Sequence, residues 1–121
     1  MSGNNLKYAR VFLAKRAFES CSVEEIRLPR ALRVIGERAF AGCKGLKEIN
    51  FDADSALEEI LPEAFYGAGL ELFVAPPSLK RLGDLAFGAC NDLKEVCLNG
   101  NVQNIGYLCL WRSGILCVRL P

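Results

Sequence analysis

The dipeptide Ala-Phe recurs through this chain of 121 residues at nearly constant spacing. Its copies, which begin at 17, 39, 64 and 86, are separated by 22, 25 and 22 residues, and a divergent fifth copy, Cys109-Leu110, follows 23 residues later. A fixed period in this range is typical of a solenoid, in which each unit buries its apolar face only by stacking on its neighbours. The spacing therefore predicts an array of stacked coils instead of a globule with one central core.

Seven apolar positions accompany each copy of the dipeptide, while the residues between them vary. In the second copy they are Val23, Ile26, Leu28, Leu32, Ile35, Ala39 and Phe40. The pattern returns 47 and 70 residues later, and once between them after an insertion of two residues. It predicts about five repeats of 22 to 25 residues in a single array over residues 1–121, with eroded and uncapped ends.

Local patterns assign the parts of each repeat. Residues 25–28 alternate polar and apolar side chains, as a half-buried strand does, and Pro29 ends the ladder. Residues 35–43 suit a turn followed by one or two turns of helix, with Phe40 filling the space between layers. The predicted fold is an α/β solenoid with a short parallel β-sheet on its concave face and short helical turns on the other.

Composition excludes several classes of protein. Hydrophobic residues make up 51% of the chain, which excludes a disordered segment, and the net charge of +1 gives no attraction to nucleic acid or anionic lipid. The apolar stretches fall short of the roughly 20 residues of a membrane span, and the first residues lack the features of a signal peptide. We expect no nucleic-acid partner, no membrane insertion, and an intracellular or organellar location in preference to secretion.

Three of the six cysteines share one repeat position, at which other copies carry Ala68 and Ser113. A position that accepts Cys, Ala or Ser favours a small buried side chain, and side chains stacked in register are poorly placed to form a disulfide. We therefore expect reduced thiols in the core at this position and at Cys109, which replaces the alanine of Ala-Phe. The three cysteines are Cys21, Cys43 and Cys90.

Enzymatic chemistry has little support in the sequence. The chain has no histidine, no CxxC pair and no glycine-rich phosphate loop, so we expect no metal, cofactor or catalytic site. Glu25 and Glu48 would lie about 5 Å apart on adjacent strands, a spacing that suits acid/base catalysis only inside a cleft. We expect an open face without a pocket there, which favours a solvated or partner-facing pair over a catalytic one.

The outward strand positions form two columns whose middle is apolar and whose rim is charged. An apolar centre with a polar rim is the anatomy of a protein-binding patch, although isolated exposed apolar residues are also common on surfaces. Cys97 and Cys117 would be diagonal neighbours on this face, and we expect two unbridged thiols, exposed or covered by a partner. The first column is Glu25, Glu48, Leu72, Glu95 and Cys117, and the second is Arg27, Asn50, Val74, Cys97 and Arg119.

Two further contacts are suggested by the sequence. Tyr66 and Trp111 occupy a repeat position that carries Ala41 or Gly88 elsewhere, and large aromatic residues at a tolerant surface position favour a second contact with a protein. Val118 and Leu120 belong to a last strand that no polar capping repeat follows. We expect another subunit, or further chain, to cover this C-terminal end.

The repeat unit C-x-x-L-x-x-I-x-L-P-x-x-L-x-x-I-G-x-x-A-F resembles the BspA-like leucine-rich repeat, also called the TpLRR type. The matching residues are Cys21, Val23, Ile26, Leu28, Pro29, Leu32, Ile35, Gly36, Ala39 and Phe40. The resemblance implies a curved solenoid that takes part in protein–protein interaction or adhesion and has no catalytic residues. The sequence departs from the pattern at Leu61-Pro62 and at residues 107–110.

Taken together, these patterns predict a non-catalytic scaffold for protein–protein interaction. It would be a structural or accessory subunit of a larger assembly, or part of a longer repeat protein. The alternative is a fragment of a cell-surface adhesin of the BspA-like type.

Overall fold

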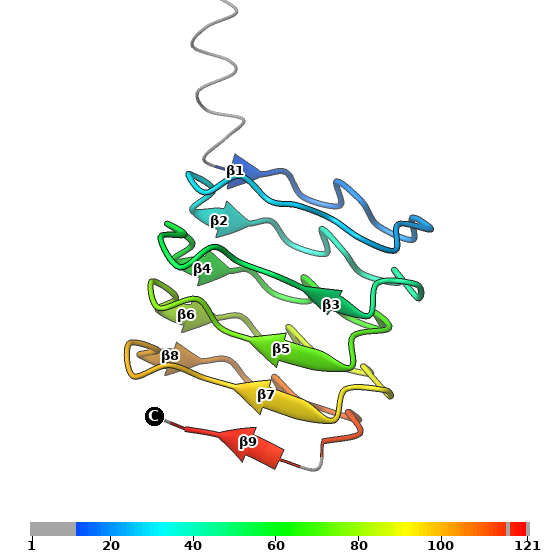
Figure 1. Cartoon of the computed structure of the whole chain (residues 1–121). Coiled ribbons are helices and arrows are strands. Elements are labelled where there is room, and N and C mark those ends of the chain that lie inside the picture. The colour runs from blue at the N-terminus through cyan, green and yellow to red at the C-terminus, as the bar shows by residue number, and fades with distance from the viewer. Residues whose placement is uncertain (1–11, 116, 121) are drawn as a thin grey trace, which may run out of the picture.

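The computed structural model describes residues 12–115 and 117–120, which form a solenoid of stacked coils with two parallel β-sheets (Figure 1). Sheet I has the strand order β1-β2-β4-β6-β8 and sheet II the order β3-β5-β7-β9. Sheet I consists of β1 (Phe12–Leu13), β2 (Val34–Ile35), β4 (Glu59–Ile60), β6 (Arg81–Leu82) and β8 (Asn104–Ile105). Sheet II consists of β3 (Glu48–Ile49), β5 (Leu72–Val74), β7 (Glu95–Cys97) and β9 (Cys117–Arg119).

The predicted solenoid, its parallel strands and its five or so coils are confirmed. Sheet I was not expected, because its strands are two residues long and too short to show an alternating pattern. Residues 25–28, predicted as a full strand, contribute to sheet II only through a bridge between Arg27 and Asn50. The next coils pair over two or three residues at the same place.

The predicted helical turns are wrong: no helix occurs in residues 12–115 and 117–120. In each coil two residues, four apart, have a left-handed backbone, such as Arg38 with φ 56° and Gly42 with φ 75°. A left-handed residue interrupts the right-handed i to i−4 bonding that an α-helix requires. Each segment is instead a series of tight turns, which together we call the turn stack (residues 14–21, 36–43, 61–68, 83–90 and 106–113).

Hydrogen bonds in the turn stack alternate between two directions. The N–H groups of Ala39 and Ala41 donate to carbonyl oxygens three residues back in their own coil. The N–H groups of Arg38, Phe40 and Gly42 donate to carbonyl oxygens of the next coil, at 3.3, 2.8 and 2.8 Å. The turns therefore satisfy their own backbone and join successive coils at the same time.

Phenylalanine rings form the centre of the core. Phe18, Phe40, Phe65 and Phe87 stack in a row, with centroids 5.5, 5.3 and 5.4 Å apart and planes within 7° of parallel. Burying each such ring contributes about 1.5–3 kcal/mol. This confirms that the phenylalanine of the dipeptide fills the space between layers, while the alanine before it, buried at positions 39, 64 and 86, lets the coils approach.

The cysteines of the core are as predicted, with one exception. Cys43, Cys90 and Cys109 are buried free thiols, and Sγ of Cys43 and of Cys90 donates to the carbonyl oxygen of the phenylalanine one coil earlier, at 3.0 Å each. Burial raises the pKa of Cys90 to about 12 and that of Cys109 to about 11. Cys21 is exposed, because it lies in the first described coil and no described residue packs over it.

Candidate functional site

The outward face of sheet II carries the columns of residues that the sequence predicts. Glu48 lies opposite Leu72, and Leu72 lies opposite Glu95, so these outward side chains line up across neighbouring coils. In the second column Val74 lies opposite Cys97, which lies opposite Arg119. The intervening strand residues Ile49, Phe73 and Val96 are 3%, 0% and 2% exposed and belong to the core. The face is therefore a regular surface of short parallel strands.

An apolar centre lies on this face. Val74 is 49% exposed, and Leu72 and Cys97 on either side of it are half-buried. At one end the Arg119 side chain forms an ion pair with Glu95, and at the other end lie Glu48 and Asn50. The structure thus brings the residues of both predicted columns together, and the function of the surface remains a prediction.

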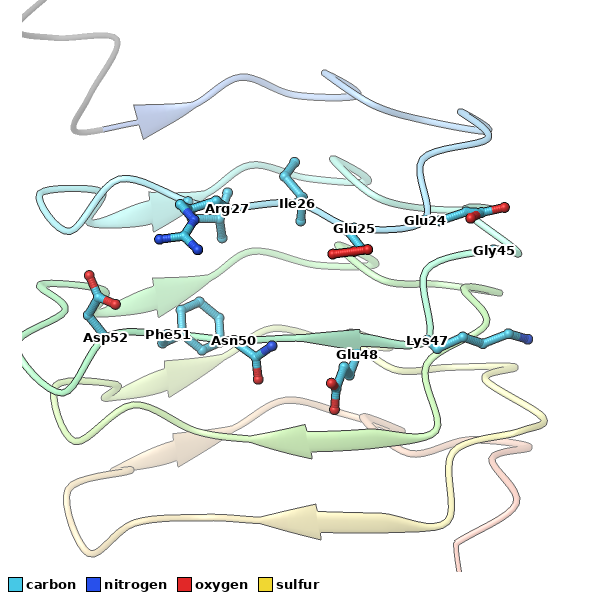
Figure 2. Close-up of a pocket in the computed structure, with 11 residues that line it drawn as sticks. Glu24, Glu25, Ile26, Arg27, Gly45, Lys47, Glu48, Asn50, Phe51 and Asp52 are labelled. Atoms are coloured by element: carbon cyan, nitrogen blue, oxygen red, sulfur yellow. The ribbon is translucent and has the colours of Figure 1, made fainter.

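An open depression of about 750 Å³ adjoins this centre. The sequence had predicted an open face without a pocket at Glu25 and Glu48. The depression lies between residues 24–28 and 45–52, where the two coils share one bridge instead of a continuous ladder (Figure 2). Ile26, Leu28 and Phe51, which are half-buried, contribute apolar surface to it. The periodicity places these three in the core, and no signal in the sequence indicates their partial exposure, because that depends on the separation of the backbones.

Charged side chains that form no ion pairs surround this depression. Glu25 and Glu48 are exposed and adjacent on neighbouring coils, and neither has a salt bridge or side-chain hydrogen bond to any residue of the described chain (Figure 2). Beyond the depression, charges are paired between coils: Arg30 with Asp54 and Arg33 with Glu58, each at 3.0 Å. The hydrogen bond from Arg33 lowers the pKa of Glu58.

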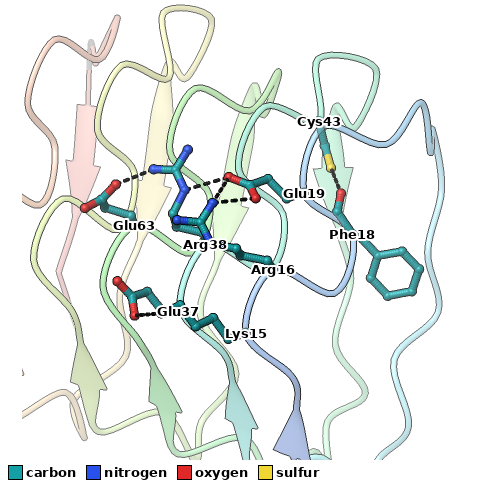
Figure 3. A network of polar contacts seen from close by, with 8 residues as sticks. All are labelled: Lys15, Arg16, Phe18, Glu19, Glu37, Arg38, Cys43 and Glu63. Atoms are coloured by element: carbon teal, nitrogen blue, oxygen red, sulfur yellow. Dashed lines mark hydrogen bonds and ion pairs between the residues drawn. The ribbon is translucent and has the colours of Figure 1, made fainter.

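A charged network joins three coils across the turn stack (Figure 3). Nε of Arg38 donates to Glu19 at 2.7 Å, another nitrogen of the same guanidinium pairs with Glu63, and Arg16 also binds Glu19. The hydrogen bonds from Arg38 and Arg16 lower the pKa of Glu19, and the bond to Glu19 raises that of Arg38. The network is satisfied within the chain and acts as a structural tie.

The two aromatic residues predicted as a second contact lie on this turn-stack side but are separate. Tyr66 is half-buried, its ring lies 5.8 Å from the Arg38 guanidinium, and it packs so close to Gly88 that a Cβ there would be 3.0 Å from the ring. Trp111 is 37% exposed, with the Arg112 guanidinium 4.8 Å from its ring. Gly88 occupies the coil between them, so they do not form one continuous patch.

The last coil exposes apolar residues that are not among the predicted contacts. Tyr107 is 74% exposed and Leu108 43% exposed, and the replacement of the Ala-Phe turn by Tyr-Leu-Cys-Leu is the signal that marks them. Cys109 and Leu110 of the same turn still point toward the core.

No three His, Cys, Asp or Glu side chains within residues 12–115 and 117–120 come together as a metal site would need. In the same residues, the structure contains no helix of the length and apolarity required to cross a membrane.

Comparison with known proteins agrees with this geometry. Six copies of the BspA type leucine rich repeat region match residues 12–121. The structure is similar to that of the leucine-rich repeat protein TpLRR of T. pallidum, with a TM-score of 0.73 and 35% identity over 79% of this chain and 45% of that chain. A leucine-rich repeat protein of Bacteroides ovatus ATCC 8483 shares the fold, with a TM-score of 0.56 and 20% identity over 87% of this chain and 42% of that chain. The chain thus spans less than half the length of both, and it matches no curated protein.

Proposed function

The chain belongs to the BspA-type leucine-rich repeat family, and on that premise we propose that it is a non-catalytic scaffold that binds another protein. The partner docks on the outward face of sheet II, and the chain serves as a structural or accessory subunit of the resulting assembly. The observation that carries this proposal is the apolar centre at Leu72 and Val74, flanked by charged residues in register on consecutive coils.

The physical argument concerns both shape and composition. Stacked coils hold their outward side chains in fixed register, which gives a preorganised surface that loses little entropy when a partner binds. An apolar centre supplies the free energy of association, and a charged rim supplies specificity. In the turn stack Arg38, Glu19 and Glu63 are already paired within the chain, which leaves the face of sheet II as the better binding surface.

The experiment compares capture by the immobilised wild-type protein and by variants from lysates of the source cells, with bound proteins quantified by mass spectrometry. Val74→Asp, alone and combined with Leu72→Asp, places a carboxylate in the apolar centre. Each variant should reduce the amount of captured partner by roughly tenfold or more. Circular dichroism checks that each variant is folded.

The matched control places the same charge on sheet I. Ile105→Asp and Phe12→Asp alter apolar strand residues that are 56% and 48% exposed, close to the 49% of Val74. We expect both controls to retain the partner. Equal retention by Val74→Asp, by the double variant and by the wild type would show that the partner does not use this face.

A further inference from the structure

Two carboxylates lie side by side at the depression. Arg27 lies opposite Asn50, so Glu25, two residues earlier, faces Glu48 across the depression, where the two coils are not paired. Like charges directly opposite each other on neighbouring strands are destabilising. Arg27 and Lys47 also line the depression, but neither pairs with Glu25, Glu48 or any other carboxylate of the described residues (Figure 2). This pair therefore lacks a direct cationic partner.

The same column shows how a carboxylate is paired elsewhere on the face. Glu95 lies opposite Cys117, and Arg119, two residues further along β9, reaches back diagonally so that its guanidinium binds the Glu95 carboxylate. The equivalent diagonal residue, two positions further along the next coil, is Val74 for Glu48 and Asn50 for Glu25. Neither residue carries a positive charge, so Glu25 and Glu48 have no counterpart of the ion pair that Glu95 forms with Arg119.

We propose that an arginine side chain of the bound protein occupies this position, between Glu25 and Glu48. A planar guanidinium can donate to two carboxylates at once, and its aliphatic stem can pack on the apolar surface of Ile26, Leu28 and Phe51. This proposal rests on the proposed function, because it names the chemistry of the partner for the same face of sheet II.

The spacing of the face adds a second requirement. Glu25, Glu48 and Leu72 occupy equivalent positions on successive coils, and only Glu48 and Leu72 are paired, so the middle of the carboxylate pair lies at least about 7 Å from Leu72. Alternate residues of an extended peptide are separated by about 7 Å. The occupant is therefore an extended segment of the form Arg-x-Leu, in which the apolar residue packs on Leu72 and Val74.

The test uses a fluorescein-labelled peptide, Gly-Arg-Ala-Leu-Gly amide, and a second peptide in which citrulline, a neutral isostere, replaces arginine. Fluorescence anisotropy reports binding to the folded wild-type protein at low salt. We expect the arginine peptide to bind. The dissociation constant of the citrulline peptide should be at least roughly tenfold higher, because the charged hydrogen bonds are lost. Glu25→Gln combined with Glu48→Gln should weaken binding of the arginine peptide by a similar factor.

A matched control removes two exposed carboxylates from other parts of the surface. Asp84→Asn combined with Asp92→Asn gives the same net charge as the Glu25 and Glu48 double variant and should bind the arginine peptide like the wild type. The proposal is overturned if the wild type does not bind the arginine peptide at low millimolar concentration, if citrulline binds equally well, or if the Glu25 and Glu48 double variant binds normally.

These outcomes separate the two proposals. If Leu72→Asp/Val74→Asp loses the cellular partner while Glu25→Gln/Glu48→Gln keeps both partner and peptide, the docking face stands and the arginine site is wrong. If Leu72→Asp/Val74→Asp captures the partner like the wild type, the proposed function is wrong, whatever the peptide does.

Discussion

The turn stack and the outward face of sheet II are built from the same coils, yet they differ in what repeats. In the turn stack two left-handed residues return in each coil, and the three middle coils share a stacked phenylalanine and a buried alanine. On sheet II only the backbone register returns, and the outward residue changes from Glu48 to Leu72 to Glu95.

The difference extends to charge. Arg38 joins Glu19 and Glu63 across three coils of the turn stack, whereas Glu25 and Glu48 lie together without ion pairs among the described residues. Within a single repeat protein, what recurs in every coil is what stacking requires, and what varies on a fixed register is available for binding. The predictions that follow test this separation, from the largest expected effect to the smallest.

The largest effect is expected in the phenylalanine row. Phe65 is fully buried between Phe40 and Phe87, so Phe65→Ala should lower the free energy of unfolding by about 3–5 kcal/mol in urea titrations. Phe65→Leu should cost clearly less, since Leu110 holds the same position in the last coil. Val74→Ala, on the face of sheet II, should change stability by less than about 0.5 kcal/mol. Equal losses for Phe65→Ala and Val74→Ala would remove the distinction between the two regions.

Left-handed backbone in the turns gives an intermediate effect. Gly67 has φ 69°, and a Cβ there would meet no atom closer than 3.6 Å, so Gly67→Ala tests backbone strain alone. It should cost about 1–2 kcal/mol. Ala89 occupies the same position one coil later, at φ 55°, and Ala89→Gly should be neutral or stabilising by up to about 1 kcal/mol. Thermal unfolding of both variants measures the effect, and a stabilising Gly67→Ala would show that this turn conformation is not the one the protein adopts.

A smaller gain in stability is expected at Val74. Val74→Arg places a guanidinium diagonally to Glu48, as Arg119 stands to Glu95, and should stabilise the protein by about 0.2–1 kcal/mol relative to Val74→Gln at low salt. Because both side chains are exposed, the gain should disappear at high ionic strength. The same variant should weaken the arginine peptide. If Val74→Arg is no more stable than Val74→Gln, then a diagonal arginine does not form with Glu48 the ion pair that Arg119 forms with Glu95.

The smallest effect is the pH dependence of stability that arises from Glu19. Hydrogen bonds from Arg38 and Arg16 lower the pKa of Glu19 below its ordinary value of 4.5, so its contribution to stability is present above that pH and is lost as the pH falls through the lowered value. Glu19→Gln should therefore be less stable than the wild type at pH 7, and the difference should shrink in acid. Urea titrations at about pH 7 and 3 measure it. A difference that does not change with pH would mean that the ion pairs contribute nothing.

Much of the fold could be predicted because stacking leaves a periodic record in the sequence. The spacing of Ala-Phe sets the coils, and the alternation around Ile49 and Phe73 sets which residues face outward, so the register of Glu48 and Leu72 followed directly. The same logic identified Cys43 and Cys90 as buried thiols. Family resemblance was confirmed over residues 12–121.

What could not be predicted depends on backbone geometry that leaves no local pattern. Left-handed residues in the described coils include Arg38, Glu63 and Leu85. Because these residue types do not indicate a positive φ, the turns were wrongly predicted as helix. The strands of sheet I are too short for alternation to show. The depression at Glu25 and Glu48 arises from incomplete pairing between two coils, and only the structure reveals it.

Carboxyl footprinting of the protein alone and with its captured partner tests the central claim most directly. Carbodiimide coupling of a neutral amine, read by mass spectrometry, reports the accessibility of each carboxylate. On this account, the partner protects Glu25 and Glu48 on the face of sheet II and leaves exposed Asp84 in the turn stack labelled as in the free protein. Protection of Asp84 with unchanged labelling of Glu25 and Glu48 would contradict it, because the partner would then bind the side assigned here to stability.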